Sequence, residues 1–507
     1  MRAISSEVEH YLDTVGVTGS IPVSPTFYTP IRLSLVTDLS ATEAQAPVVV
    51  IGLGRSGIGA ARLIHAQGQR VLVLERGGND ALQAQASVLA AEGIEVRLET
   101  PLSLEQLTGM QPRPRAVVIS PGLDWNHPVL VGLRHAGIPV QGEAALAWEA
   151  SGGVPWIAIT GTNGKTTVTH LVQHLLESAG LDAPLCGNVG TSVAAVLAQR
   201  LQNDQAKPDH LVVELSSYQI EAAPAIQPAI GLWTTLTPDH LERHGSLEAY
   251  RAIKHHLLAQ STVRILNGDD PDLQAHAGPW PNSRWITAGP AADLPGHLRA
   301  SLWIEADAQG RPMVRHERGP LFPADVLAMP GDHNKRNLLM ATATGLELGL
   351  DPEAMAAAFR RFPGVPHRLE RISTVAGITW FNDSKATNYD AAAVALEALD
   401  GPLIVLAGGQ SKQGDANSWL QGLEERAAAV ILFGASRPTF ARLLEDHGYS
   451  GVVLQAEGLS DAVPLALQSA QELNVTTVLL SPACASFDQY SDFEARGEHF
   501  RQLVLAL

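Results

Sequence analysis

One segment, residues 156–168, constrains the fold more than any other part of the chain. An apolar, strand-like run ends in Gly161-Thr-Asn-Gly164-Lys165-Thr166, and a helical pattern follows. In such a unit the backbone N–H groups of the loop point into one concavity and the helix dipole adds positive potential, so the loop binds phosphate. We predict that Lys165 contacts the β- and γ-phosphates of a nucleotide and that the Thr166 hydroxyl binds Mg²⁺. Because Ile159 stands where the usual first glycine would be, an ordinary strand–helix loop is the alternative.

Length and charge limit the class of protein. A chain of 507 residues is too long for one hydrophobic core and predicts three domains. The net charge of −17 argues against nucleic acid or an anionic membrane as the main partner. The two cysteines, Cys186 and Cys484, lie far apart, which favours free thiols in a reducing compartment. We find no apolar run that could cross a bilayer and no signal-peptide pattern, and therefore expect a cytoplasmic protein.

Residues 47–57 form a second glycine pattern near the N-terminus. An apolar run leads into Gly52-Leu-Gly54-Arg-Ser-Gly57, and a second strand-like run ends at Glu75. This is the fingerprint of dinucleotide or nucleotide binding, and alone it would suggest a dehydrogenase. A tight turn that packs a helix against a sheet without a ligand is the alternative. Residues 115–122 are predicted as a later strand of the same sheet, and residues 1–46 as an N-terminal extension without a motif.

Several later strand-like runs end in polar side chains. Glu214 ends one run, Asp239 and His240 follow the next, and Asn267 ends a third. Because parallel strands place their carboxyl ends at one edge of a sheet, we expect these groups to lie together. A carboxylate beside a loop hydroxyl suits Mg²⁺, so Glu214 is a candidate ligand, although a carboxylate that caps a helix would look the same. Residues 301–315 predict a hairpin, interpreted as a small accessory sheet.

After residues 362–368, which resemble a linker, strands and helices alternate again and predict another mostly parallel sheet. Here three motifs identify a family. Residues 161–167, 382–388 and 481–490 resemble those of the Mur ligases, and the likeness extends in order from about Val48 to Leu507. It implies an α/β chain of three domains after the extension: a Rossmann-like domain at 47–151, a central P-loop ATPase-like domain with a small accessory sheet at 152–363, and a Rossmann-like domain at 364–507.

The resemblance also implies an activity. Members of this family form amide bonds at the cost of ATP through an acyl phosphate, in peptidoglycan precursor synthesis. The last two motifs are similar to those of members that add D-glutamate to UDP-N-acetylmuramoyl-L-alanine. The implied cofactors are ATP, two Mg²⁺ ions and a carbamylated lysine at Lys254. The implied partners are these small molecules, without nucleic acid or membrane, and the family usually consists of monomers.

Site residues follow from the matching positions. The resemblance implies catalytic roles for Lys165, His240, Lys254 and Lys385, and metal ligands at Thr166, Glu214, His240 and carbamylated Lys254. ATP would be held by Gly161, Thr162, Asn163, Gly164, Lys165, Thr166, Thr167, Asn334, Asn337, His367, Arg368 and Asp383. The UDP-sugar would be held by Gly52, Arg55, Ser56, Glu75, Arg76, Ser120, Gly122 and Asn188. D-Glutamate would be held by Thr387, Lys412, Ser486 and Phe493.

The chain departs from the family pattern in places, and three rival functions stay open. Glu75-Arg76 stands where an acid and a small polar residue are usual, Cys186 where a glycine is common, and residues 408–415 vary from Gly-Gly-Asp-Gly-Lys. One rival is a family member adding another amino acid. Those that add diaminopimelate usually carry Asp-Asn-Pro-Arg, which this chain lacks. The others are a nicotinamide-dependent oxidoreductase and a catalytically idle nucleotide-binding scaffold.

Overall fold

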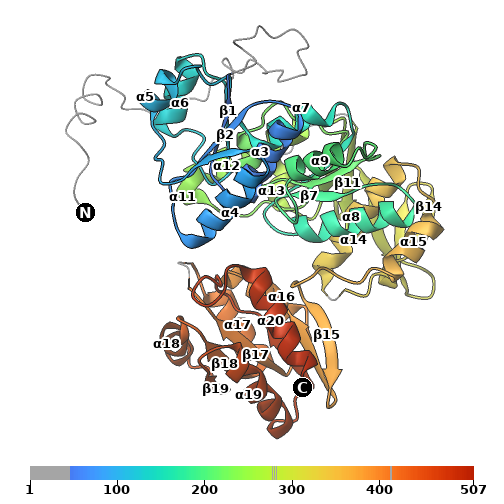
Figure 1. Cartoon of the computed structure of the whole chain (residues 1–507). Helices are drawn as coiled ribbons and strands as arrows, with labels where there is room; N and C mark the ends of the chain where they lie inside the picture. Colours follow the sequence, from blue (N-terminus) through green and yellow to red (C-terminus); the bar gives the residue numbers. More distant parts are fainter. Residues whose placement is uncertain (1–45, 277, 279, 281, 330, 412–413) are drawn as a thin grey trace.

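The computed structural model describes residues 46–507 except 277, 279, 281, 330, 412 and 413. Apart from Ala46, the predicted extension lies outside this range. The described chain builds three β-sheets in succession, each packed against helices (Figure 1). The predicted fold class is therefore confirmed: a three-domain α/β protein. Among the described residues, no helix is both long and apolar enough to span a membrane.

The first sheet has five parallel strands in the order β3-β2-β1-β4-β5. Its strands are β1 (Val48–Ile51), β2 (Val71–Leu74), β3 (Glu95–Arg97), β4 (Ala116–Ile119) and β5 (Val140–Gly142). The helices of this domain are α3 (Arg55–Ala66), α4 (Asp80–Ala91), α5 (Leu104–Gly109), α6 (Pro128–His135) and α7 (Glu143–Ser151). Strands β2 and β4 are fully buried, as expected for short apolar strands covered on both faces.

The central sheet has nine strands in the order β14-β13-β12-β11-β10-β9-β6-β8-β7. The strands from β6 to β11 are parallel, and are β6 (Trp156–Thr160), β7 (Leu185–Gly187), β8 (Leu211–Glu214), β9 (Ile230–Trp233), β10 (Val263–Asn267) and β11 (Ser283–Thr287). The remaining strands are β12 (Ala300–Ala306), β13 (Pro312–His316) and β14 (Gly319–Pro323). The helices are α8 (Lys165–Ser178), α9 (Val193–Gln202), α10 (Ser217–Glu221), α11 (Leu241–His244), α12 (Leu247–Gln260), α13 (Pro271–His276), α14 (Asp332–Glu347) and α15 (Pro352–Arg360).

The predicted hairpin is present as β12 and β13, which pair antiparallel. It does not stand as a separate sheet, however, because β12 also pairs parallel with β11. The accessory sheet expected from the sequence is therefore an extension of the central sheet. The reason is physical: β11 would otherwise leave an unpaired edge, and β12 satisfies its backbone groups.

The third sheet has six strands in the order β15-β16-β20-β17-β18-β19, parallel except for β15. Its strands are β15 (Glu370–Val375), β16 (Ile378–Asn382), β17 (Leu403–Gly408), β18 (Ala427–Phe433), β19 (Val452–Gln455) and β20 (Thr477–Leu480). Its helices are α16 (Tyr389–Glu397), α17 (Asn417–Arg426), α18 (Arg437–His447), α19 (Leu459–Glu472) and α20 (Phe493–Leu505).

The hydrophobic core joins the first two domains and leaves the third separate. One cluster of buried apolar side chains runs from Val48 through Ala194 to Trp156, so the first and central sheets share it across α3 and α9. The third sheet has its own clusters on its two faces. In Figure 1 this third domain (orange to red) lies to one side of the other two. A site between the central and third domains is therefore built on two independently packed bodies.

Candidate active site

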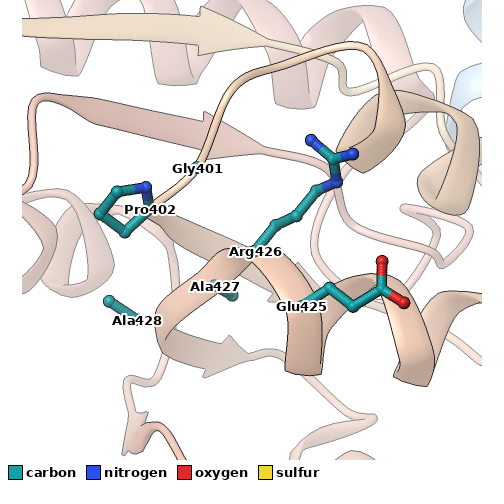
Figure 2. A pocket seen from close by; sticks show the side chains of 6 residues that line it. All are labelled: Gly401, Pro402, Glu425, Arg426, Ala427 and Ala428. Carbon is teal, nitrogen blue, oxygen red and sulfur yellow. The ribbon is translucent and has the colours of Figure 1, made fainter.

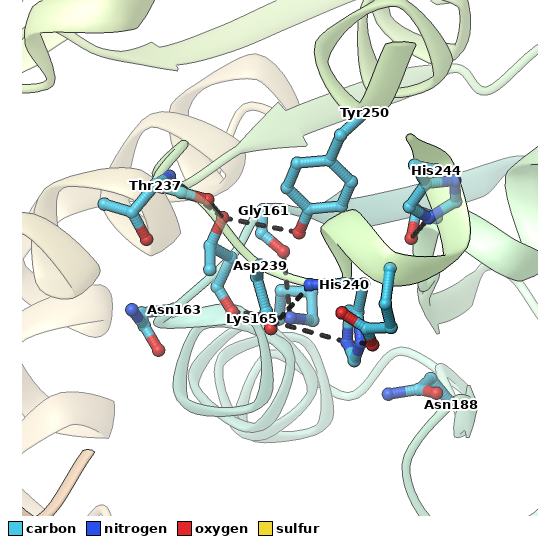
Figure 3. Close-up of polar contacts among 12 residues, drawn as sticks. Gly161, Asn163, Lys165, Asn188, Thr237, Asp239, His240, His244 and Tyr250 are labelled. Atoms are coloured by element: carbon cyan, nitrogen blue, oxygen red, sulfur yellow. Dashed lines mark hydrogen bonds and ion pairs between the residues drawn. The ribbon is translucent and has the colours of Figure 1, made fainter. Parts of the chain in front are cut away.

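Residues 161–164 form the predicted phosphate-binding loop, called here the phosphate-type loop. It connects the buried strand β6 to helix α8. Gly161 has φ +148°, and a Cβ at this residue would lie 1.9 Å from Thr234 Oγ1, so only glycine fits. Lys165 Nζ donates to the carbonyls of Gly161 and Thr162, both at 2.8 Å. Burial lowers the pKa of Lys165, and the negative charge of Glu214 partly opposes that shift. The lysine thus lies at the start of α8, folded against its own loop (Figure 3).

Residues that follow β9 hold the loop in place. Thr162 N–H donates to the Thr235 carbonyl at 2.9 Å, and Asn163 N–H to Thr235 Oγ1 at 2.9 Å. Thr162 Oγ1 donates to the Thr237 carbonyl at 3.1 Å and lies 3.3 Å from the Tyr250 hydroxyl (Figure 3). These contacts fix the loop before any ligand binds.

Lys254 approaches the same loop from α12 and is only 1% exposed. Its Nζ donates to Thr160 Oγ1 at 3.2 Å and to the Gly161 carbonyl at 3.1 Å, and lies 4.5 Å from the Tyr250 ring centre. Within the described chain, no carboxylate forms an ion pair with it. Burial, reinforced by the charge of Lys165, lowers the pKa of Lys254 well below its usual value. Its amine is therefore poised to be neutral.

Glu214 ends β8 and is 1% exposed. Its Oε1 accepts a hydrogen bond from Asn188 Nδ2 at 2.8 Å, while Oε2 has no hydrogen-bond partner among the described residues. Burial disfavours its ionisation, but the charges of Lys385 and Lys165 outweigh burial and lower the pKa of Glu214. Lys385, from the third domain, donates through Nζ to Thr166 Oγ1 at 2.8 Å. The structure thus brings two predicted metal ligands, Thr166 and Glu214, together with Lys385.

His240 is the N-cap residue of α11. Its side chain is 44% exposed, with Nε2 3.5 Å from Asp239 Oδ2 and Nδ1 3.9 Å from Glu242 Oε1. Its ring centre is 5.2 Å from that of Tyr218. In the part of the chain that the structure describes, no three His, Cys, Asp or Glu side chains gather as a ready metal site. His240 therefore adjoins Asp239, Glu242 and Tyr218, and its role as a metal ligand stays a prediction.

The predicted nucleotide residues of α14 and the third domain lie close to the loop. Asn337 Nδ2 donates to Asn334 Oδ1 at 2.9 Å, and Asn337 Oδ1 would lie 3.0 Å from a Cβ on Gly164. Asp383 accepts hydrogen bonds from Leu369 N–H and the Ser481 hydroxyl, both at 3.1 Å. Burial raises the pKa of Asp383 to about 7, opposed chiefly by Arg368.

Arg368 and His367 lie on the segment that enters the third domain. Arg368 Nε is buried and has no hydrogen-bond partner among the described residues, so this guanidinium has an unused donor. His367 Nδ1 is 3.0 Å from Asn382 Nδ2. Burial lowers the pKa of His367, which favours the neutral ring.

The predicted UDP-sugar residues lie at the carboxyl ends of β1, β2 and β4 and on a loop of the central domain. Glu75 is engaged with its own loops: Oε2 accepts from Leu53 N–H and Oε1 from Gly77 N–H, both at 2.8 Å. Ser120 Oγ donates to the Ile51 carbonyl at 3.1 Å, and Arg55 Nη1 to the Gly190 carbonyl at 3.1 Å. The other members near this edge are Gly52, Ser56, Arg76 and Gly122. Asn188, bonded to Glu214, connects this region to the phosphate-type loop.

The predicted D-glutamate residues follow strands of the third sheet, and Lys412 among them lies outside the described residues. Ser486 is 2% exposed, whereas Thr387 and Phe493 are half-buried. Lys385 Nζ lies 5.2 Å from the Phe493 ring centre. Phe493 therefore adjoins the lysine that reaches the phosphate-type loop.

Sequence reasoning missed two titratable groups here, the half-buried His170 and the buried Glu143. His170 lies four residues after Thr166 on α8, so the helix places it over the same face. Burial and the charge of Lys385 lower the pKa of His170 to about 4. Glu143, at the start of α7, is 2% exposed and accepts a hydrogen bond from Ala194 N–H at 2.7 Å. The spacing from Thr166 could have indicated His170, whereas an isolated glutamate in a helix gives no signal.

A hollow of about 500 Å³ lies elsewhere (Figure 2). It is lined by Gly401, Pro402, Glu425, Arg426, Ala427 and Ala428, where β17 and β18 begin. The candidate site residues lie at the opposite, carboxyl ends of these strands. Arg426 Nη1 already donates to the Leu399 carbonyl at 3.0 Å. This hollow is therefore separate from the candidate site.

Family models match most of the chain. The Mur ligase MurD-like N-terminal domain matches residues 46–142, the Mur ligase middle domain 159–345, and the glutamate ligase domain of Mur ligases 367–484. Two relatives bear the name UDP-N-acetylmuramoylalanine–D-glutamate ligase. The protein from Synechococcus sp. (strain CC9605) is 56% identical over 456 residues, 90% of this chain and 98% of its own length. That from Prochlorococcus marinus (strain MIT 9313) is 53% identical over 460 residues, with the same coverage.

Solved structures share the fold at low identity. The UDP-N-acetylmuramate-alanine ligase MurC of Thermotoga maritima has a TM-score of 0.58 at 18% identity, covering 91% of this chain and 99% of its own. A type C pseudomurein peptide ligase of Methanothermus fervidus has a TM-score of 0.55 at 21% identity, with the same coverage. A folylpolyglutamate synthase of Mycobacterium tuberculosis, complexed with ADP, has a TM-score of 0.53 at 18% identity, covering 71% of this chain and 92% of its own.

Proposed function

This chain belongs to the Mur ligase family, and we propose that it is the ATP-dependent ligase that adds D-glutamate to UDP-N-acetylmuramoyl-L-alanine during peptidoglycan precursor synthesis. The observation that carries the proposal is identity above 50%, over nearly the whole length, to relatives named for this activity. The geometry supports it, because a phosphate-type loop, a buried carboxylate and a lysine from a second domain meet at one place.

ATP would bind at the loop between β6 and α8. Lys165 would exchange its bonds to the loop carbonyls for the β- and γ-phosphates, and the helix N-terminus would add its dipole. Arg368, with its unused Nε donor, and Lys385 bring further positive charge. These cations would neutralise the γ-phosphate while the substrate carboxylate attacks it to give an acyl phosphate, a step in which two anions must meet.

The residues around Glu214 fit Mg²⁺. A buried carboxylate oxygen without a partner, beside the Thr166 hydroxyl, is an arrangement of oxygen donors that a hard cation prefers. Thr166 and Glu214 would hold one ion, which would offset phosphate charge. A second ion would involve His240 and Lys254, as expected from the family.

We further propose that Lys254 is carbamylated. Carbamylation needs a neutral amine to attack CO₂, and burial, reinforced by the charge of Lys165, lowers the pKa of Lys254, which favours the neutral amine. The new carboxylate would place an anion beside Lys165. Labelled CO₂ followed by carbon NMR would detect the carbamate, and Lys254→Arg should abolish the signal because arginine cannot form it.

D-Glutamate would bind on the third domain, where Thr387 and Ser486 offer hydroxyls and Phe493 an apolar wall, with Lys412 completing the prediction. Its amine would attack the acyl phosphate and release phosphate. Lys385 would lie between the ATP site of the central domain and the D-glutamate site of the third domain, since its side chain bonds Thr166. The closed arrangement would keep water from the acyl phosphate.

The rivals are weaker. A nicotinamide site would need Glu75 to bind a ribose, yet both its oxygens accept backbone N–H groups. An idle scaffold would not explain why the buried Lys254 and Glu214 lie around the loop that also holds Lys165. A cytoplasmic, monomeric enzyme with only small-molecule partners stays our prediction.

The decisive test measures phosphate release from ATP and Mg²⁺ with UDP-N-acetylmuramoyl-L-alanine and one amino acid at a time. Release and a product heavier by one glutamate are expected with D-glutamate alone, not with L-glutamate or diaminopimelate. Lys165→Met should abolish release, whereas Lys335→Met, an exposed lysine of α14, should leave it unchanged. Turnover with another amino acid would refute the substrate, and no turnover by folded, CO₂-supplied protein would favour the scaffold.

A further inference from the structure

Arg496 is a fully buried cation that the activity described so far does not use. It lies on α20, its exposure is 0%, and all five of its N–H groups have acceptors. Nε donates to Ser384 Oγ at 2.9 Å, and Nη2 to the carbonyls of Ser384 at 2.8 Å and Cys484 at 3.0 Å. Nη1 donates to the carbonyls of Ala485 at 3.3 Å and Gly408 at 3.4 Å. Throughout the described ranges, no carboxylate forms an ion pair with this guanidinium.

The acceptors come from three segments at the carboxyl edge of the third sheet. Ser384 follows β16, Gly408 ends β17, and Cys484 and Ala485 follow β20. Two of these segments also pair with each other, because Gln410 N–H donates to the Ala485 carbonyl at 2.8 Å and Ala485 N–H to the Gln410 carbonyl at 3.1 Å. One side chain therefore ties together three loops that are far apart in sequence.

The backbone packs tightly around Arg496. A Cβ on Gly409 would lie 2.3 Å from the Ala485 carbonyl oxygen and 3.0 Å from Arg496 Nη1. Burial lowers the pKa of Arg496 to about 10, so it stays charged at neutral pH. Burying a cation without an ion-pair partner is costly, and four carbonyls, the Ser384 hydroxyl and the charges of nearby carboxylates such as Asp488 offset that cost here. An apolar side chain could fill the same volume, but it could not bond three loops at once.

The same loops carry the amino-acid site of the proposed function. Lys385 follows Ser384, Ser486 follows Ala485, and Phe493 begins the helix that bears Arg496. Ser384 Oγ also donates to the Phe493 carbonyl at 2.9 Å. Lys385 and Ser486 each follow a residue that accepts a hydrogen bond from Arg496, and Phe493 lies one helical turn before Arg496 on α20.

We propose that Arg496 is a positioning residue for the amino-acid substrate, which sets the mutual spacing of the three loops through its five hydrogen bonds. This inference rests on the proposed function. Arg496 does not touch the substrate itself. Displacing one loop by about 1 Å can reduce catalysis about 100-fold, so loss of the guanidinium should affect the amino acid far more than the nucleotide.

The test compares Arg496→Lys and Arg496→Met with Phe500→Leu. Phe500 is buried on the same helix against Trp380, away from the three loops, so its variant reports loss of packing alone. We expect both Arg496 variants to raise KM for D-glutamate by about tenfold or more, with KM for ATP changed less than about threefold. The lysine variant should retain more activity than methionine, because it keeps the charge and part of the bonding.

Three results would overturn the inference: an unchanged KM for D-glutamate, equal changes in KM for ATP and D-glutamate, or the same pattern in Phe500→Leu at a matched melting temperature. If Arg496→Met does not fold, Ser384→Ala removes the Nε acceptor together with the bond from Ser384 Oγ to the Phe493 carbonyl, and should still raise KM for D-glutamate selectively. Failure of the proposed function is distinct, since the wild-type chain would then not ligate D-glutamate. The KM comparison would be made with whichever amino acid it does ligate.

Discussion

Gly161→Ala should damage the phosphate-type loop by an amount that the structure lets us work out. At φ +148° any residue other than glycine is strained, which costs roughly 1–3 kcal/mol. The new Cβ would also displace Thr234 Oγ1, which donates to the Asn163 carbonyl at 2.5 Å and the Thr160 carbonyl at 3.2 Å. Because the hydroxyl has a single proton, the two carbonyls share one bifurcated hydrogen bond, and its loss costs roughly 1 kcal/mol. The sum is about 2–4 kcal/mol, or a fall of about 10 °C in melting temperature.

A double-mutant cycle separates the two causes. In Thr234→Ala the hydroxyl is already absent, and the Thr234 Cβ would lie 3.1 Å from the new methyl group, so mainly backbone strain remains. Gly161→Ala should therefore cost about 1 kcal/mol less in that background. Denaturant titration and thermal melting of the four proteins, with ATP binding measured in parallel, check this. Equal costs in both backgrounds, or a single-variant cost below about 1 kcal/mol, would refute the steric argument.

Three further predictions follow from the buried charges. Burial raises the folded-state pKa of Glu143 from 4.5 to about 7. The folded chain therefore keeps a proton that the unfolded chain loses, so stability falls as pH rises from about 4.5 to about 7. Glu143→Gln should reduce that fall by roughly 1–3 kcal/mol in melting experiments across this range, and an unchanged slope would contradict it. Lys385→Met removes the bond to Thr166 and should increase the radius of gyration without ligand in solution scattering, whereas Lys335→Met should not. Glu214→Gln should weaken Mn²⁺ binding with ATP by about tenfold or more, measured by electron paramagnetic resonance; unchanged affinity would remove Glu214 from the metal site.

The sequence predicted the sheets best where strands are apolar and buried. The strands β1, β6, β17 and β20 are short apolar runs next to glycine or polar turns, and local pattern is enough to find them. Strand β19 went unpredicted because it lies at the sheet edge and is largely exposed, so its composition carries little periodicity. The hairpin was predicted, but its attachment to β11 depends on pairing between separate segments, which local pattern does not reveal.

The site residues also divide into those that local sequence pattern reveals and those that depend on contacts between distant segments. Lys165 and Thr166 belong to one contiguous motif and could be found directly, and Glu214 could be found because it ends an apolar run. The approach of Lys385 to Thr166 joins residues 219 positions apart, and only the family resemblance indicated that both belong to one site. Arg496 gave no signal, because an arginine in an amphipathic helix is usually a solvent-facing residue.

The Gly161 carbonyl accepts hydrogen bonds from both Lys165 and Lys254. On the proposed function, an arriving phosphate would therefore meet a Lys165 ammonium that already has two carbonyl partners, and its binding would exchange one oxygen for another. The free energy of binding is the difference between two polar arrangements, not the full attraction of bare charges. Such an exchange would keep nucleotide affinity moderate. It would also return Lys165 to the Gly161 and Thr162 carbonyls when the nucleotide leaves, so release need not leave this ammonium without a hydrogen-bond partner.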